Sequence, residues 1–300
     1  MTRAAVRVGT FEPGSLQWHA ARDGGIGGSE IAAVLGLSPW ESRFSLWHKK
    51  NGLAATGSDN EAMRWGRRLE NLIADWFAEQ HPEFRVRRTG TWRNRLRPFQ
   101  IGNPDRLLYG LTKRAVLGIK TARDSLGWGR PGTDEIPVYY RAQVLWYLDT
   151  LGFTEAYIAV LIGGSDYREY HVPYDAGEAA TLRKAAAQFI TSLESGTPPD
   201  IDTHAATYQV IRELHPDIDD VDVEIAGELA ERYRAALADH KAAEALKRQA
   251  AAEVLDALGR ARRAVCAGEP IAIRVPGRGD APPSLRPSPV RPPMQKVSAA

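Results

Sequence analysis

Two neighbouring stretches of this sequence decide its fold, Gly102-Asn-Pro-Asp-Arg-Leu-Leu-Tyr109 and Ala115-Val-Leu-Gly-Ile-Lys-Thr121. Each contains an apolar run of strand length and turn residues separate them, so we expect two adjacent strands. If they pair as a hairpin, Asp105 and Lys120 converge at one end of a sheet, where residues 118 and 120 share a face. A carboxylate that holds Mg²⁺ and a lysine that orients or deprotonates water suit phosphodiester hydrolysis. Taken alone, such a pair is more often a turn residue and a solvated lysine.

Helices and further strands surround this hairpin. Apolar residues recur at helical spacing from Glu61 to Glu79, which predicts an amphipathic helix. Helices are also expected at 15–21, at 29–35 with Ser29 as its cap, at 138–151 and at 176–193, and strands at 84–92, at 99–102 continuing to 107–109, at 156–162 and at 167–172. This order favours an α/β fold in which helices flank a central mixed sheet.

The composition excludes several classes of protein. No apolar run approaches the roughly 18 residues that cross a bilayer, and the single cysteine, Cys266, cannot pair within the chain. The first residues lack the apolar stretch of a signal peptide, so we expect a soluble protein of a reducing cytoplasm. The net charge is only +2, but six arginines lie between Arg85 and Arg97. Arginine suits phosphate and so favours nucleic-acid binding, although a genome rich in Arg and Ala codons is the simpler explanation.

The distribution of residue types divides the chain. All eight tryptophans lie in the first half, and a turn-forming stretch begins at Ser195, so we expect one domain over residues 1–200 and a linker at 201–222. Residues 223–275, rich in Ala, Glu, Arg and Leu, predict a helical extension, and seven prolines in the last 25 residues predict a disordered basic tail at 276–300. The extension could serve oligomerisation or partner docking and its arginines could contact DNA, with a solvated helix and tail as an equal alternative.

Two helical positions could carry further chemistry. Glu70 lies on the apolar face of the 61–79 helix, where an ionised carboxylate needs a metal or a cationic partner. A structural ion pair with one of the many arginines is the more frequent case. Gln143 and Tyr147, four residues apart on a helix, share one face and can reach a common target, although this spacing is also ordinary in cores.

A glycine-rich stretch, Arg22-Asp-Gly-Gly-Ile-Gly-Gly-Ser29, is a candidate anion site. Its backbone N–H groups, the hydroxyl of Ser29 and the guanidinium of Arg22 could surround a phosphate. A flexible capped turn is the equal alternative.

Together and in this order, these motifs are far more specific than any one alone. The sequence resembles the YqaJ-like viral recombinases, phage-type relatives of lambda exonuclease with a PD-(D/E)XK, restriction-endonuclease-like α/β core. The resemblance covers about two thirds of the chain, residues 18–193, and is carried by Arg22, Gly27-Gly-Ser-Glu30, Trp65-Gly66, Glu70, Asn103-Pro-Asp105, Ile119-Lys-Thr121, Trp128-Gly129, Ile136-Pro137, Gln143 and Tyr147.

The resemblance implies a Mg²⁺-dependent exonuclease, with Mn²⁺ as the alternative metal, that degrades linear double-stranded DNA from 5′ ends in phage or prophage recombination. It would act in the cytoplasm of a bacterial host as a homo-oligomer, a ring in lambda-type members, together with a single-strand annealing protein. The implied roles are metal ligation by Glu70, Asp105 and the main-chain carbonyl of Ile119, water positioning by Lys120 with support from Gln143 and Tyr147, and binding of the 5′-terminal phosphate by Arg22 and Ser29.

One residue departs from the family pattern. Two positions before the lysine the family has an acidic metal ligand, and here the residue is Gly118. Loss of such a ligand ordinarily costs several orders of magnitude in rate. Three accounts stay open: the enzyme is slow or prefers Mn²⁺, the chain binds DNA ends without cutting them, or another acid takes the role, namely Glu30, Asp124, Asp134 or Glu135. A restriction-type endonuclease is a weaker hypothesis, since the fold hosts both activities.

Overall fold

The two stretches quoted above form an antiparallel pair of strands, β5 (Arg106–Tyr109) and β6 (Arg114–Ala122), as their apolar patterns predict. The computed structural model describes residues 4–12, 14–55 and 60–288. Three more strands complete a sheet in the order β2-β5-β6-β7-β8, namely β2 (Arg85–Arg88), β7 (Glu155–Ile162) and β8 (Asp166–Pro173). Within it only β6 and β7 are parallel, so the sheet is mixed.

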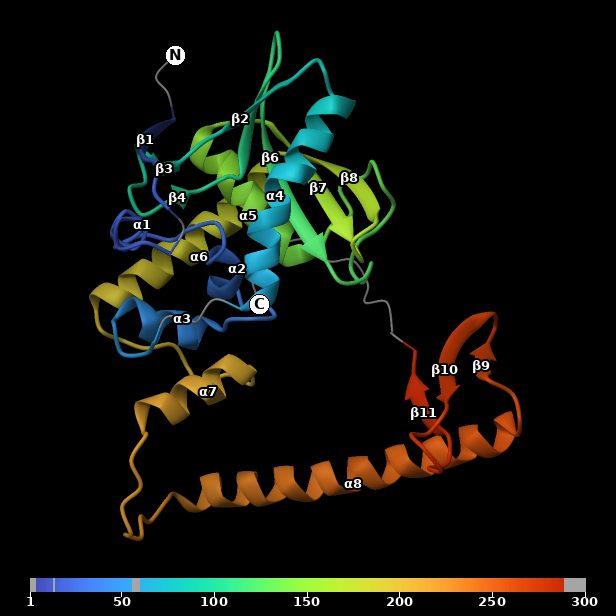
Figure 1. Cartoon of the computed structure of the whole chain (residues 1–300). Helices are drawn as coiled ribbons and strands as arrows, with labels where there is room; N and C mark the ends of the chain where they lie inside the picture. Colours follow the sequence, from blue (N-terminus) through green and yellow to red (C-terminus); the bar gives the residue numbers. More distant parts are fainter. Residues whose placement is uncertain (1–3, 13, 56–59, 289–300) are drawn as a thin grey trace. The chain divides into compact units, whose positions relative to one another are not determined.

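Two helices cover the two faces of this sheet, with α4 (Glu61–Gln80) in front and α5 (Val138–Leu151) behind in Figure 1. Successive residues of β6 point to opposite faces. Val116 therefore packs into the core that includes Leu145 of α5, and Leu117 into the core that includes Ile73 and Phe77 of α4. The predicted sheet flanked by helices is confirmed.

A smaller sheet and a group of helices adjoin the α5 face. The order of this sheet is β1-β3-β4, with β1 (Ala5–Gly9), β3 (Thr91–Asn94) and β4 (Ile101–Gly102). The helices are α1 (Leu16–Ala20), α2 (Ile31–Val34), α3 (Arg43–Lys50) and α6 (Ala176–Glu194). Neither β1 nor α3 was predicted from the sequence. β1 is exposed along most of its length, so it lacks a clear apolar face, and α3 is only two turns long.

The segment expected to be a linker, 201–222, contains the helix α7 (Ala205–Leu214). Its buried side chains are Thr207 and Val210, and the hydroxyl of Thr207 donates to Ser42 Oγ at 2.6 Å. The core therefore continues past residue 200, and the compact unit ends at Pro216. Two buried positions in a polar sequence are too few to reveal such a helix by periodicity.

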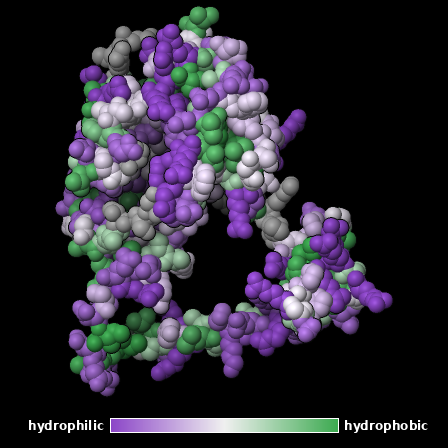
Figure 2. Space-filling model, viewed as in Figure 1, coloured by the Kyte–Doolittle hydropathy of each residue, from purple (hydrophilic) through white to green (hydrophobic). Residues whose placement is uncertain are grey.

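The second compact unit begins at Asp217. It contains the helix α8 (Gly227–Leu258), in which no residue is buried, and Figure 2 shows hydrophobic residues at the surface along it. The helix predicted to continue to residue 275 is wrong for residues 263–275, which form β9 (Arg263–Cys266) and β10 (Glu269–Val275). Ala267 and Gly268 both have positive φ and make the two-residue turn between them, and Ile271, Ile273 and Val275 alternate as in a strand.

The tail predicted to be disordered, residues 276–300, contains a strand in its described part. Its first described part contains β11 (Ser284–Pro287), which pairs with β10, and residues 289–300 lie outside the described chain. Among the described residues, no helix combines the length and apolarity that a membrane span requires.

Candidate active site

Asp105 and Lys120 meet at the end of the β5–β6 pair. Arg106, directly after Asp105, lies opposite Leu117, so the strand pairing brings Asp105 to the last residues of β6. The backbone N–H of Ile119 donates to Asp105 Oδ2 at 2.6 Å, and Lys120 Nζ lies 3.8 Å from the same oxygen. Both side chains are mostly buried, with 14% of Lys120 and 22% of Asp105 exposed. The predicted convergence of this pair is confirmed.

Tyr140 forms one wall beside the lysine. Lys120 Nζ lies 5.0 Å from the centre of the Tyr140 ring, within the range of a cation–π contact. Burial raises the pKa of the Tyr140 phenol, and the neighbouring Tyr139 and the carboxylate of Asp105 raise it further. The phenol therefore stays neutral and able to donate a hydrogen bond at physiological pH.

Glu70 approaches this pair through an arginine. Arg106, only 6% exposed, donates from Nη1 to Glu70 Oε1 at 2.5 Å and to the main-chain oxygen of Asp105 at 2.6 Å. Its Nη2 donates to Asn71 Oδ1 at 2.8 Å. Glu70 thus has the arginine partner that the sequence left open as an alternative to a metal, and Arg106 is a site residue that sequence reasoning missed. The dipeptide Asp105-Arg106 was the only available signal.

The glycine-rich stretch lies against the side chains of Arg22 and Tyr147. A Cβ atom at Gly27 would lie 2.3 Å from Arg22 Nη2, and one at Gly28 would lie 2.2 Å from Tyr147 Cε1. A side chain at position 28 would displace the buried Tyr147 ring, and one at position 27 would displace the guanidinium of Arg22. Gln143 Nε2 donates to the Tyr147 hydroxyl at 2.9 Å, as the i,i+4 spacing predicts.

Tyr147 also links this stretch electrostatically to Asp105. Burial raises the pKa of Tyr147, and the nearby charges of Asp105 and Glu30 raise it while Gln143 and Arg22 oppose the increase. The phenol is neutral at physiological pH. Its charged neighbours include the carboxylate of Asp105 and the guanidinium of Arg22.

Ser29 does not cap a helix, contrary to the sequence prediction. α2 begins at Ile31 with Glu30 as its N-cap residue, and the hydroxyl of Ser29 instead accepts a hydrogen bond from Arg22 Nη2 at 3.1 Å. The Glu30 side chain does not cap the helix either, because its carboxylate accepts a hydrogen bond from the N–H of Gly27 at 2.6 Å. Since α2 is a single turn, its dipole adds little, and an anion here would depend on the side-chain cations.

Those cations are Arg22 and Lys50, and Glu30 holds both. Glu30 Oε1 lies 3.3 Å from Arg22 Nη2 and 3.1 Å from Lys50 Nζ. Burial would raise the pKa of Glu30, but the two cations and the Gly27 N–H outweigh it and keep the pKa below its usual value. The cluster keeps one net positive charge. Sequence reasoning missed Lys50, which lies 20 residues from Glu30 on α3.

Gly118 is packed against a neighbouring strand. It lies opposite Ile158 in the parallel β6–β7 ladder, and a Cβ at position 118 would lie 2.7 Å from Ile158 Cδ1. Ile158 is 1% exposed. The space beside an acidic residue at this position is therefore filled by an apolar side chain.

The four acids considered as substitutes are engaged elsewhere. Glu30 holds Arg22 and Lys50 as described, and the partners of the others are Leu126 N–H for Asp124, Arg141 for Asp134 and Arg130 N–H for Glu135. In the described part of the chain, no hydrogen bond or ion pair joins any of the four to Asp105, Glu70 or Lys120. Of the four, Glu30 alone acts on the same phenol, Tyr147, as Asp105 does.

The oxygen donors at the β5–β6 end suit a hard cation. Carboxylates and main-chain carbonyls are the ligands that Mg²⁺ takes, and Mg²⁺ is commonly held by one or two carboxylates plus substrate phosphates. Among residues 4–12, 14–55 and 60–288, no three acidic, histidine or cysteine side chains are grouped for a metal. Asp105 and Glu70 therefore fit one such ion rather than a cage of protein ligands.

Comparison with known proteins agrees with this geometry. A family model described as a YqaJ-like viral recombinase domain matches residues 17–155. The uncharacterized protein YqaJ of Bacillus subtilis is 31% identical over 219 residues, which cover 71% of this chain and 67% of that protein. Protein D345L of African swine fever virus is 36% identical over 58 residues, 19% of this chain and 17% of the viral protein.

A solved structure shows the fold. The structure of LHK-Exo, an alkaline exonuclease from Laribacter hongkongensis, in complex with dAMP has a TM-score of 0.50 and 16% identity over 61% of this chain and 94% of that chain. The expected restriction-endonuclease-like α/β core is confirmed. The chain belongs to the YqaJ-like viral recombinase family.

Proposed function

We propose that this protein is a DNA exonuclease that removes nucleotides from the 5′ ends of linear double-stranded DNA in phage or prophage recombination. The observation that carries the proposal is the group of Asp105, Lys120 and the Ile119 backbone at one strand end, with Glu70 attached through Arg106. A bacterial cytoplasm, a homo-oligomeric ring and a single-strand annealing partner belong to the same proposal.

Mg²⁺, or Mn²⁺ in its place, would be held by Asp105, Glu70 and the main-chain carbonyl of Ile119. When bound, the ion stabilises the negative charge that develops on the phosphate oxygens. For Glu70 to bind the metal ion, Arg106 must release Glu70 Oε1 while keeping its hydrogen bond to the main-chain oxygen of Asp105. Arg106 can then hold the second Glu70 oxygen.

The remaining groups orient the substrate. Lys120, which forms an ion pair with Asp105, donates to the attacking water, whose oxygen forms a bond to phosphorus as the bond to the 3′ oxygen breaks. The water gives up a proton and the leaving oxygen takes one, so a 5′-mononucleotide with a free 3′ hydroxyl departs. The neutral phenols of Tyr140 and Tyr147 can donate to phosphate oxygens without adding charge.

Arg22, Ser29 and Lys50 suit the terminal phosphate. A phosphate that enters this cluster meets two cations and a hydroxyl, with Glu30 fixing the cations in advance. Each cleavage leaves a new 5′ phosphate on the shortened strand, so the same cluster can bind the product of every turnover.

Gly118 favours a second candidate function, a protein that binds DNA ends but cuts them poorly. The apolar packing of Ile158 where an acid would stand leaves the centre with two carboxylates. Such a centre supplies less negative charge to a metal and binds it more weakly.

One experiment separates the two functions. The natural protein, Asp105→Ala and Gly118→Glu are incubated with linear 5′-phosphorylated duplex DNA and Mg²⁺ or Mn²⁺, with the exposed carboxylate variant Asp75→Ala as the matched control. Digestion by the natural protein and Asp75→Ala but not by Asp105→Ala supports the exonuclease. Digestion by Gly118→Glu alone supports the end-binding protein, and no metal-dependent digestion by any variant contradicts the enzyme.

A further inference from the structure

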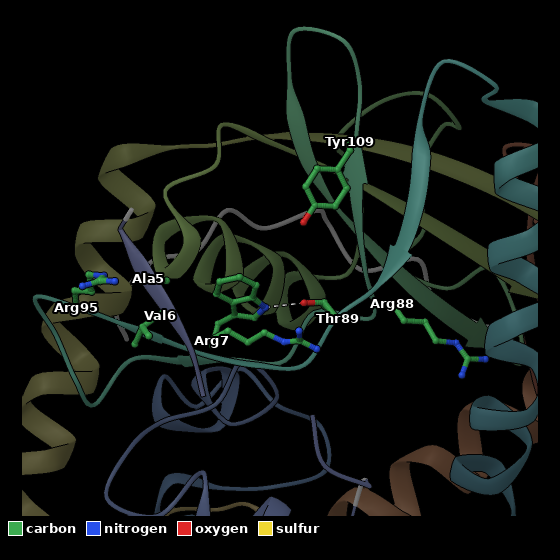
Figure 3. A pocket seen from close by; sticks show the side chains of 8 residues that line it. Ala5, Val6, Arg7, Arg88, Thr89, Arg95 and Tyr109 are labelled. Carbon is green, nitrogen blue, oxygen red and sulfur yellow. Dashed lines mark hydrogen bonds between the residues drawn. The ribbon is translucent and has the colours of Figure 1, made fainter. Parts of the chain in front are cut away.

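A second cationic site lies where the small sheet meets the edge of the large one. A pocket of about 300 Å³ is lined by β1, by β3 and the turn before it, and by the ends of β2 and β5. Figure 3 shows Arg7 reaching toward Thr89 and the hydroxyl end of Tyr109 directed into the same space. Arg88 and Arg95 lie at its two sides.

The three arginines of this pocket carry charge that no acid neutralises. Arg7 donates to Thr10 Oγ1 at 2.5 Å and Arg88 donates to Asn71 Oδ1 at 2.6 Å, both neutral partners. Within the described residues, no carboxylate forms an ion pair with Arg7, Arg88 or Arg95, and no acidic side chain lines the pocket. Guanidinium groups match the geometry of phosphate, so three of them spread along the pocket could each meet a phosphate of an extended strand.

Two aromatic rings share the pocket with these cations. Trp92 is half-buried and its indole N–H donates to Thr89 Oγ1 at 2.6 Å, which fixes the ring. Tyr109 is 36% exposed. Arg7 lies directly opposite Trp92 in the β1–β3 ladder, so a cation and a ring are held side by side. Aromatic rings interleaved with arginines are the typical means by which proteins bind single-stranded nucleic acid.

The pocket connects to the candidate active site through one side chain. Asn71 Oδ1 accepts hydrogen bonds from both Arg88, at 2.6 Å, and Arg106, at 2.8 Å. Arg106 in turn holds Glu70. Tyr109 ends the strand that begins directly after Asp105, so the two sites are separated by the length of β5, roughly 13 Å.

From this arrangement we infer that the pocket binds a single-stranded segment of DNA beside the active site, with arginines on its phosphates and a base on Tyr109. The inference rests on the proposed function for its DNA substrate. A duplex cannot place a base here, because its bases are stacked and paired inside the helix, whereas the pocket has the size of a small-ligand site. The pocket therefore holds the separated strand at the junction where digestion proceeds. Two arginines of the segment from Arg85 to Arg97, Arg88 and Arg95, would contact the phosphates of that strand.

The test compares two double charge reversals in the full-length protein. Arg7→Glu/Arg95→Glu changes two exposed pocket residues, and Arg85→Glu/Arg87→Glu makes the same charge change at exposed positions of β2 that do not line the pocket. Binding of a short fluorescent oligothymidylate is measured by anisotropy across a salt series without metal. We expect the pocket variant to bind at least about tenfold more weakly and its salt slope to fall by about 1.4, since each phosphate contact contributes about 0.7. The control should change the slope by less than half as much.

Tyr109 gives a test that does not change charge. Tyr109→Ala should weaken oligothymidylate binding about tenfold with an unchanged salt slope, and Tyr109→Phe should bind as the natural protein does, because stacking needs the ring alone. Thermal unfolding of every variant shows whether the fold persists, and both reversed arginines are exposed, so no buried contact is lost.

The outcomes separate this inference from the proposed function. Equal losses in the two double variants, unchanged binding in the pocket variants, or no oligothymidylate binding by the natural protein would each overturn the pocket. If the natural protein binds the oligonucleotide through these residues but does not digest duplex DNA with any metal, the pocket stands and the exonuclease fails. If the natural protein digests duplex DNA but the pocket variants bind the oligonucleotide normally, the exonuclease stands and the pocket fails.

Discussion

At the scale of single residues, Gly118 and Ile158 form a matched pair. Adding a side chain at 118 forces Ile158 Cδ1 aside, and overpacking of this kind costs about 1–3 kcal/mol. Ile158→Val removes that one atom. We expect Gly118→Glu to lower the melting temperature and Gly118→Glu/Ile158→Val to recover part of the loss and to digest DNA faster than either single variant. Calorimetry and the duplex assay measure both effects, and a single variant as stable and active as the double would show that Ile158 imposes no constraint.

A second residue-scale prediction concerns Glu30. Its carboxylate holds Arg22 and Lys50, and its pKa is lowered in the folded state. A depressed pKa contributes stability above the unfolded-state pKa that is lost as pH falls through the folded value. Glu30→Gln, which keeps an acceptor for Gly27, should therefore lower the free energy of unfolding at pH 7 by about 1–3 kcal/mol. Urea denaturation should show this difference shrinking below about pH 4, and a constant difference across pH would contradict it.

At the scale of elements, His81 fastens the end of α4 to β8. It follows the last helical residue, and its Nε2 lies 2.7 Å from Glu169 Oε2 while Nδ1 lies 3.0 Å from Glu83 Oε1. Tyr167 donates to the other oxygen of Glu169. Burial lowers the pKa of His81, but the two carboxylates outweigh it and raise the pKa above its usual value.

The contacts of His81 with Glu169 and Glu83 make the stability of the fold depend on pH. A raised histidine pKa contributes stability that is fully present below the unfolded-state pKa and is lost as pH rises through the folded value. We expect the melting temperature to decline from about pH 6 to pH 8 and the decline to be smaller in His81→Gln. Differential scanning calorimetry across this range, with His240→Gln on the exposed α8 as the control, measures it. Parallel pH profiles for all three proteins would show that His81 contributes no pH-dependent stability.

Which elements the sequence could predict depended on how they are buried. α5 has the predicted bounds because both ends of its apolar run coincide with Pro137 and Gly152. β1 could not be found, since its partner β3 is 82 or more residues away and only that pairing makes it a strand. The β9–β10 hairpin was hidden by the alanine-rich helix before it, although its period of two was present.

At the scale of the whole molecule, the fold assembles a site from distant segments. Asp105 and Lys120 could be paired from sequence because a hairpin joins neighbours. Lys50 and Arg106 could not, because their contacts with Glu30 and Glu70 arise only when α3 and α4 pack beside other elements. A charged residue without a motif carries no sequence signal until its partner is known.

The first compact unit ends at Pro216, just after α7. α7 packs on α3, Val210 of α7 is only 3% exposed, and the Thr207 hydroxyl donates to Ser42, the residue before α3. Removing α7 leaves this surface of the first unit uncovered, at a cost of about 2–4 kcal/mol for one apolar side chain and a buried hydrogen bond. A chain of residues 1–216 should therefore melt within a few degrees of the full protein, whereas residues 1–200 should melt roughly 4–16 °C lower.

The same truncation tests what α8 contributes. Its exposed apolar side chains include Leu229, Tyr233 and Leu237, which are spaced four residues apart along one side of the helix. If α8 joins copies of the chain, residues 1–216 should have a smaller native mass by light scattering and bind DNA with a smaller salt slope than the full protein, because linked copies contact more phosphates. An unchanged mass and slope, with the fold intact by calorimetry, would assign oligomerisation and DNA binding to the first unit alone.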